Sequence, residues 1–99
     1  VEEPMGSNFI PNDLVEQGIA KALSNPNKIH HILASKHNFG PLVDLLGERG
    51  LVRVAMYSIN GRYPTSGFYQ LNANIYGYDV WVRGYVFDGV PMLGTMYIP

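Results

Sequence analysis

Cysteine is absent from this chain of 99 residues, and so is any strong excess of charge. Without cysteine the chain can have neither a disulfide framework nor a thiolate metal site. Its formal net charge of −1 is unlike that of proteins that coat DNA or RNA, which are usually basic. No apolar run reaches the length of a membrane-spanning helix. The sequence therefore predicts one domain with a single core, in which any anion-binding site is small and local.

Residues 69–98 predict a three-stranded antiparallel meander. A type II′ turn is expected at Gly77-Tyr78, because glycine suits the first position of that turn. A three-residue loop is expected at 87–89, where Gly89 would close a G1 bulge. The pairs that follow from these turns are Leu71 with Gly84, Arg83 with Leu93, and Trp81 with Thr95.

A two-residue turn at Asp88-Gly89 is the alternative for the second hairpin. It would place Thr95 and Tyr97 among the valines of the apolar face, because a shift of one residue moves every side chain of a strand to the other face. The hydrophobic pattern therefore favours the three-residue loop.

Side chains alternate across a strand, so the predicted registers give the sheet two different faces. One face is almost wholly apolar and is expected to be buried; it collects Tyr69, Leu71, Ala73, Ile75, Val80, Val82, Gly84, Val86, Val90, Met92, Gly94, Met96 and Ile98. The other is rich in amides and aromatic rings and collects Gln70, Asn72, Asn74, Tyr76, Trp81, Arg83, Tyr85, Leu93, Thr95 and Tyr97. We expect this second face to be the working surface of the protein.

Helices are predicted before the meander, over residues 13–23, 28–34 and from 40 onward. Asn12 is expected to cap the first, and Gly47 to cap or break the third. Residues 48–59 fit either a helix or a strand, and we favour a helix that ends at Asn60-Gly61. Helices followed by an antiparallel sheet define an α+β fold in which the N-terminal helices pack on one face of the sheet. We expect a disordered lead-in over 1–11 and a single domain over 12–99.

Three histidines, His30, His31 and His37, lie within eight positions. A metal site needs three or four converging ligands at a defined spacing, and the sequence has no such motif. Two alternatives stay open: a solvated helix face followed by a loop, or a pair of imidazoles that transfer protons near neutral pH.

Arg83 is the one cation expected on the polar face of the sheet. Its guanidinium suits a phosphate, although stacking on neighbouring rings would serve equally. Thr95 and Tyr97 can offer hydroxyls to a phosphate oxygen or a catalytic base, or simply be good strand formers. Trp81 and Tyr85 offer flat surfaces for base stacking or for packing.

The run from His31 to Asn38, the leucine-rich segment after it and the end of the chain, Gly94-Thr95-Met96-Tyr97-Ile98, carry a resemblance. They resemble the C-terminal toxin domains of contact-dependent growth inhibition (CdiA-type) and related polymorphic toxin exoproteins. Within these, the chain looks like the group with the barnase/EndoU/colicin/RelE-like ribonuclease fold. In that fold, N-terminal helices cover one face of an antiparallel sheet and RNA is cut on the other.

The resemblance implies a ribonuclease that needs no metal or other cofactor and acts on RNA, in particular tRNA. The RNA 2′-hydroxyl would attack the adjacent phosphate, with one group removing its proton and another protonating the leaving oxygen. The residues that match the family pattern as catalytic groups are His31, His37, Arg83, Thr95 and Tyr97. Those expected to bind substrate are Lys36, Asn72, Trp81 and Tyr85. His30 stands beside His31, so either could carry the proton.

The resemblance also implies a cellular setting. The domain would be the tip of a large secreted or cell-surface protein, would act in the cytoplasm of a target bacterium, and would be blocked by a cognate immunity protein. The alternative from the residues themselves is a non-catalytic module of an exoprotein, whose aromatic and amide-rich face binds a protein or a carbohydrate.

Overall fold

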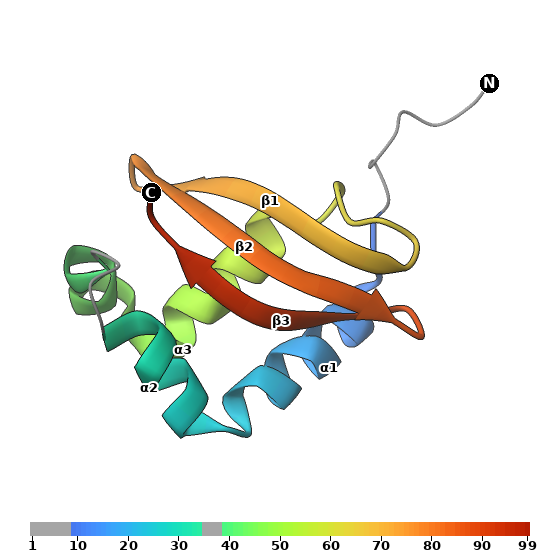
Figure 1. Ribbon diagram of the computed structural model, residues 1–99, viewed down its shortest axis with the longest axis horizontal. Helices are drawn as coiled ribbons and strands as arrows, with labels where there is room; N and C mark the ends of the chain where they lie inside the picture. Colours follow the sequence, from blue (N-terminus) through green and yellow to red (C-terminus); the bar gives the residue numbers. More distant parts are fainter. Residues whose placement is uncertain (1–8, 35–38) are drawn as a thin grey trace.

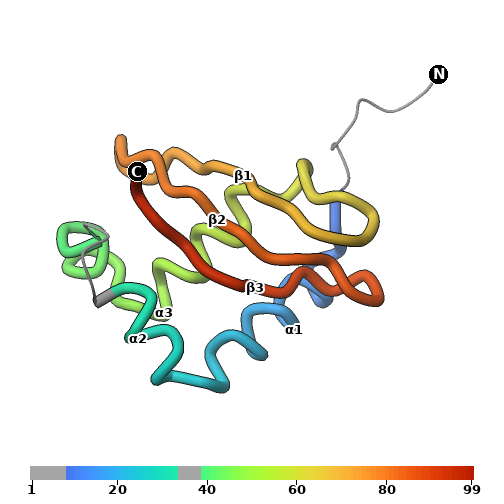
Figure 2. Tube along the Cα trace, viewed as in Figure 1, coloured from blue at the N-terminus to red at the C-terminus, as the bar shows by residue number. Residues whose placement is uncertain are grey.

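Three helices lie on one side of a three-stranded antiparallel sheet in the computed structural model, which describes residues 9–34 and 39–99 (Figure 1). The elements follow one another as α1 (Asn12–Leu23), α2 (Pro26–Ala34), α3 (Gly40–Ser58), β1 (Gly67–Ile75), β2 (Tyr78–Phe87) and β3 (Val90–Tyr97). The strands lie side by side in chain order, as the backbone trace shows (Figure 2). The predicted α+β fold, with helices on one face of the sheet, is therefore confirmed.

The helices form because their apolar residues repeat at helical spacing and meet the apolar face of the sheet. The buried side chains are Val15, Ile19 and Ala22 in α1, Ile29, Ile32 and Leu33 in α2, and Leu42, Leu51, Val52, Ala55 and Met56 in α3. The ambiguous segment 48–59 is helical up to Ser58, as favoured, and Gly47 breaks α3 with a positive φ of 74°.

Two helix starts differ from the sequence prediction. Asn12 does not cap α1; Pro11 occupies the cap position, and its carbonyl accepts hydrogen bonds from the backbone N–H groups of Leu14 and Val15. α2 begins at Pro26 instead of residue 28, because proline has no N–H to lose in a first turn. The Asn25 side chain accepts a bond of 3.2 Å from the Lys28 N–H and satisfies one of the free donors there.

The ordered domain begins earlier than residue 12. Ile10 is 5% exposed and belongs to the core. The Asn60 side chain binds both backbone groups of Ile10: its Oδ1 accepts from the Ile10 N–H at 2.9 Å, and its Nδ2 donates to the Ile10 carbonyl at 3.0 Å. An amide in the turn after α3 thereby fixes the chain just before α1, so the predicted lead-in does not extend to Ile10.

The first hairpin turns at Tyr76-Gly77, one residue earlier than predicted. Both residues have positive φ, 51° and 84°, which is the geometry of a type I′ turn. The Asn74 side chain accepts a hydrogen bond from the Gly77 N–H at 3.0 Å. The pairing shifts by two residues, so that Leu71 faces Val82 instead of Gly84. A shift of two leaves every side chain on its predicted face.

The second hairpin combines the two alternatives that the sequence left open. Asp88-Gly89 forms a two-residue turn with φ of 56° and 78°, so the predicted three-residue loop is wrong. A bulge then follows, because Gly84 pairs with Leu93 but Arg83 pairs with Thr95, which leaves Gly94 as the extra residue. Between the turn and the bulge, the side chains of β3 lie on the faces opposite to those predicted. Leu93 is buried in the core instead of lying on the polar face, and Met92 lies beside Tyr85 instead of being in the core. After it, Thr95 and Tyr97 return to the polar face.

A glycine in β2 allows a side chain to cross the covered face of the sheet. Tyr69 is opposite Gly84, and its hydroxyl donates a hydrogen bond of 2.8 Å to the Met92 carbonyl on β3. A Cβ added at Gly84 would lie 1.9 Å from the Met92 carbonyl oxygen and 2.7 Å from the Tyr69 hydroxyl. Burial raises the pKa of Tyr69, which keeps the hydroxyl a neutral donor.

Candidate functional site

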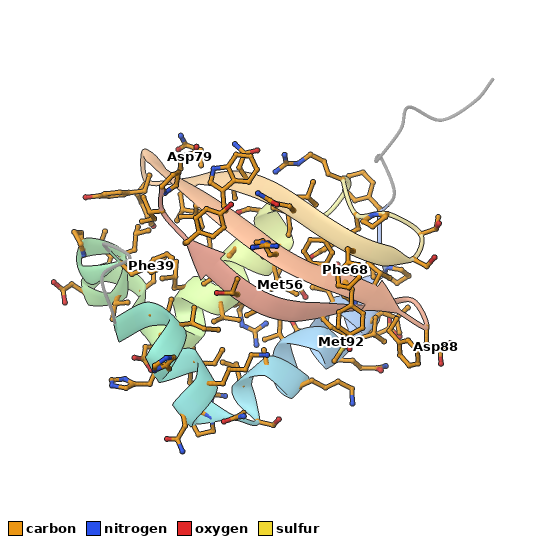
Figure 3. All side chains as sticks on the ribbon, viewed as in Figure 1. Phe39, Met56, Phe68, Asp79, Asp88 and Met92 are labelled. Carbon is orange, nitrogen blue, oxygen red and sulfur yellow. The ribbon has the colours of Figure 1, made fainter. Side chains whose placement is uncertain are left out.

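The face of the sheet that points away from α1, α2 and α3 carries three rows of side chains, each running across all three strands. We call it the open face. The rows are Phe68, Tyr85 and Met92; then Gln70, Arg83 and Thr95; then Asn72, Trp81 and Tyr97. Phe68 and Asp79 mark its two ends in Figure 3. Arg83 thus stands in the central row, with aromatic rings in the row on either side.

Arg83 lies at a hollow of about 560 Å³ on the open face. The residues that line this hollow are Phe68, Tyr69, Gln70, Arg83, Gly84, Tyr85, Gly94 and Thr95. The Arg83 side chain is exposed and forms no hydrogen bond or ion pair within 9–34 and 39–99. A guanidinium has five donors in a fixed fork, so it is free to hold an anion of matching shape, such as a phosphate or a carboxylate.

Each aromatic pair beside Arg83 has its own geometry. The rings of Trp81 and Tyr97 are almost parallel, at 12°, with centroids 6.4 Å apart. Phe68 and Tyr85 meet edge to face, at 61° and 6.0 Å. Phe68 is 88% exposed, which leaves a large apolar ring in water beside a charged group. Rings of this kind are platforms for flat ligands.

Hydrogen bonds hold the polar side chains of the open face in place. Gln70 Nε2 donates to the Tyr97 hydroxyl at 2.8 Å, across β2. Asn72 Nδ2 donates to Asp79 at 3.0 Å, and the Arg62 guanidinium binds the Asn72 carbonyl at the outer edge of β1. Asn72 and Tyr97 therefore have partners within the chain, whereas Arg83 has none among the residues that the structure describes.

The histidines lie elsewhere. His31 is exposed on α2, which belongs to the helical layer, and His30 forms a pair of 3.0 Å with Glu48 of α3. Neither of them lines the hollow. Lys36, His37 and the loop predicted over 35–38 lie outside the described residues. The structure thus brings together Arg83, Thr95 and Tyr85, with Asn72, Trp81 and Tyr97 in the next row, and places His31 apart from them.

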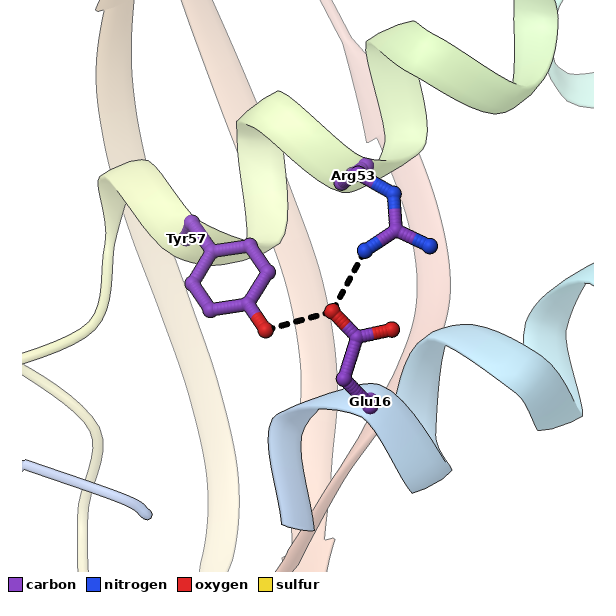
Figure 4. A network of polar contacts seen from close by, with 3 residues as sticks. All are labelled: Glu16, Arg53 and Tyr57. Carbon is purple, nitrogen blue, oxygen red and sulfur yellow. Dashed lines mark hydrogen bonds and ion pairs between the residues drawn. The ribbon is translucent and has the colours of Figure 1, made fainter. Parts of the chain in front are cut away.

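A polar network on the helical layer provides a contrast to the open face (Figure 4). Glu16 of α1 accepts hydrogen bonds from the Tyr57 hydroxyl, at 2.5 Å, and from the Arg53 guanidinium, both on α3. The bond from Tyr57, and then that from Arg53, lowers the pKa of Glu16. The same bond raises the pKa of Tyr57. The Glu16 carboxylate and its two donors thus satisfy one another and join α1 to α3.

Two members of the site, Phe68 and Gly94, were missed in the prediction from the sequence. Phe68 was left out because the first strand was expected to begin at residue 69, whereas it begins at Gly67. Gly94 was assigned to the covered face, but as the extra residue of the bulge it is exposed and lines the hollow. Extending the alternation of Gln70 and Asn72 back by two residues would have found Phe68.

No group of three or more histidine, aspartate or glutamate side chains in 9–34 and 39–99 could hold a metal ion. Within the same residues, no helix is both long and apolar enough to cross a membrane. Comparisons with family models, with curated proteins and with solved structures find no match to this chain.

Proposed function

We propose that this chain is an endoribonuclease that works without a metal ion and holds its RNA on the open face. The observation that carries the proposal is the Arg83 guanidinium, which lines a hollow, stands in the row between two aromatic pairs and has no partner in the described part of the chain. A partnerless cation with aromatic rings beside it matches the chemistry of a nucleotide, which joins an anionic phosphate to a flat base.

Single-stranded RNA suits this face better than a duplex. Its bases are free to stack on exposed rings such as Phe68, whereas a duplex hides them inside the helix. The net charge of −1 also favours recognition of a short segment over coating of a long strand, because non-specific affinity depends on many cationic contacts.

The reaction would be attack of a ribose 2′-hydroxyl on the adjacent phosphate, with loss of the 5′ oxygen of the next nucleotide. Arg83 would stabilise the extra negative charge on the phosphate, and the Thr95 hydroxyl, its cross-strand neighbour, would donate to the same oxygens. The Tyr97 hydroxyl, positioned by Gln70, is a proton donor one row away. For the base we propose His37, which lies outside the described residues, because His30 is paired with Glu48 and His31 belongs to α2 in the helical layer.

The test is incubation of the purified chain with total bacterial RNA in the presence of EDTA, followed by a denaturing gel. We expect discrete cleavage by the wild type, about a hundredfold slower cleavage by Arg83→Gln, and loss of cleavage in His37→Ala. Arg49→Gln is the matched control, because Arg49 is an exposed arginine on α3 and the change in net charge is the same. Intact RNA with the wild type, also after addition of cell extract, would refute the ribonuclease.

The same observations support a second candidate, a binding module without catalysis. Among residues 9–34 and 39–99, no imidazole or carboxylate lines the hollow around Arg83, so these residues offer it no such group to transfer protons. A module of this kind would retain single-stranded RNA in a filter-binding assay, in a manner that depends on Arg83, and would leave every strand intact.

The proposed setting is competition between bacteria, with a cognate immunity protein as the partner that covers the open face. Expression of the chain in a bacterial cytoplasm should then arrest growth, and Arg83→Gln should relieve the arrest. Normal growth during expression of folded wild-type protein would refute the role as a toxin. It would not bear on RNA cleavage itself, which the assay above tests.

A further inference from the structure

The hollow beside Arg83 extends to one side only, and this asymmetry points to a particular part of the ligand. Its walls are the central row and the Phe68–Tyr85 pair, and Trp81 and Tyr97 are not among its lining residues. The two aromatic pairs are thus not equivalent. One pair already stacks ring against ring, while the other is splayed and opens onto the hollow.

The floor of the hollow is bare backbone. Gly84 of β2 and Gly94, the extra residue of the bulge, lie against each other: a Cβ added at Gly94 would be 3.5 Å from the Gly84 Cα and 3.0 Å from the Arg83 carbonyl oxygen. A Cβ added at Gly84 would point at the Tyr69 hydroxyl on the covered face, so the main chain left bare toward the hollow is that of the exposed Gly94. A flat ring can therefore lie against the sheet here, beside Tyr85.

The spacing of the polar and aromatic groups fits one nucleotide. Arg83 and Tyr85 are two residues apart on the same side of β2, which corresponds to about 6.6 Å along an extended strand. In a nucleotide, the sugar bridges a gap of this kind between phosphate and base. Gln70 and Thr95 stand beside Arg83 in the central row and can hydrogen-bond to the sugar or to the edge of the base.

We infer that the hollow is a subsite for a single ribonucleotide, with its phosphate on Arg83 and its base against Phe68 and Tyr85. This inference rests on the proposed function, because it assigns the nucleotide on one side of the phosphate that the ribonuclease would hold. It adds a separate expectation: affinity depends on the presence of a base, and the dependence resides in Phe68 and Tyr85. The stacked Trp81–Tyr97 pair is then outside the subsite.

The inference is tested by isothermal titration calorimetry of the purified chain with small ligands, which detects binding wherever it occurs on the chain. The ligands are inorganic phosphate, ribose 5-phosphate and the four ribonucleoside 3′-monophosphates. We expect the monophosphates to bind at least about tenfold tighter than ribose 5-phosphate. Phe68→Ala and Tyr85→Ala should abolish that difference and leave the binding of ribose 5-phosphate unchanged, whereas Arg83→Gln should weaken all ligands.

Phe87→Ala is the matched control. Phe87 lies on β2 like Tyr85 and is 64% exposed, but it does not line the hollow. Equal binding of ribose 5-phosphate and of the monophosphates would overturn the inference, and so would an equal loss with Phe87→Ala and Phe68→Ala. Thermal unfolding of each variant checks that it is folded. All these substitutions change exposed side chains, three of them rings and one a guanidinium, so we expect each variant to fold.

The outcomes separate this inference from the ribonuclease. Base-dependent binding that needs Phe68, together with RNA that stays intact, would leave the subsite standing and refute the enzyme. Cleavage of RNA by Phe68→Ala with an unchanged KM would refute the subsite and leave the enzyme standing.

Discussion

The two faces of the sheet obey different constraints, although the same three strands form both. On the covered face, Val80, Val82 and Met96 are fully buried, and the buried hydroxyls of Tyr63 and Tyr69 donate to backbone carbonyls. No buried side-chain nitrogen or oxygen in 9–34 and 39–99 lacks a hydrogen-bond partner. On the open face, by contrast, the exposed ring of Phe68 and the guanidinium of Arg83 line the same hollow, and that guanidinium has no partner in the described ranges.

The difference shows which residues the fold requires and which it merely tolerates. Burial and hydrogen bonding account for the covered face within the chain itself. An exposed apolar ring and a partnerless cation gain nothing from folding, and such departures from what stability needs are expected at functional sites.

Gly84→Ala should have the largest effect, because it fills the path by which Tyr69 reaches the Met92 carbonyl. The new Cβ would lie 1.9 Å from that oxygen, so the two strands would have to separate. We expect a loss of about 3 kcal/mol or more in the free energy of unfolding, measured with urea. Gly40→Ala is the control, since a Cβ there meets nothing within 4 Å. Similar losses in both variants would contradict the packing described for the covered face.

Tyr69→Phe and Tyr85→Phe remove the same hydroxyl from opposite faces. The Tyr69 hydroxyl is buried and binds Met92, so its removal leaves a carbonyl without a donor and should cost about 1–3 kcal/mol. Tyr85 is 42% exposed and solvent can replace any bond of its hydroxyl, so we expect a change within about 0.5 kcal/mol. Urea unfolding of the two variants measures the difference. An equal cost would mean that the hydroxyl of Tyr69 is also accessible to water.

The sequence predicted the two faces better than it predicted the pairing that creates them. Side chains alternate between the two faces, so only a register shift by an odd number of residues moves them to the other face. The pairing at Tyr76-Gly77 is shifted by two residues, and every side chain of that hairpin therefore keeps its predicted face. At the second hairpin the polar positions of Thr95 and Tyr97 were right and the loop was wrong, because a tight turn followed by a bulge at Gly94 also restores the parity. A bulge forms where strand pairing and turn geometry conflict, and the alternation of residue types does not locate it.

The candidate site was predicted in part for the same reason. Arg83 and Thr95 were expected on one face, and the structure makes them direct cross-strand neighbours. The hollow depends on the bulge, so its glycine floor could not be seen in the pattern. The grouping of histidines with these residues rested on the resemblance, and His31 lies on the helical layer instead.

Glu16→Gln should have a smaller effect, and one that depends on pH. Hydrogen bonds from Tyr57 and Arg53 lower the pKa of Glu16 in the folded state, so the carboxylate stabilises the fold above its unfolded pKa of about 4.3. That contribution is lost as the pH falls through the lowered folded pKa. Urea unfolding at about pH 7 and about pH 3 should therefore show a difference between wild type and variant that shrinks in acid.

Tyr57→Phe is the matched variant for this network. It removes the hydrogen bond that lowers the pKa of Glu16 most and keeps the charge of Arg53. The acid-induced loss of stability should then be smaller than in the wild type and should be complete at a higher pH, because the folded pKa of Glu16 lies closer to its unfolded value. Both effects should be smaller than that of Tyr69→Phe, because solvent and salt screen partners at the surface. A difference between Glu16→Gln and wild type that stays constant with pH would contradict the role given to the carboxylate.

Arg83→Gln should change stability least and function most. The guanidinium is exposed and bonds to nothing in the described part of the chain, so its replacement should alter the free energy of unfolding by no more than about 0.5 kcal/mol. The same variant should lose about a hundredfold in RNA cleavage. Urea unfolding and the cleavage assay on one preparation measure both quantities, with Arg49→Gln as the control that should change neither. Had the cation a structural role, stability and cleavage would fall together; a loss of cleavage alone means that the partner of Arg83 comes from outside the chain.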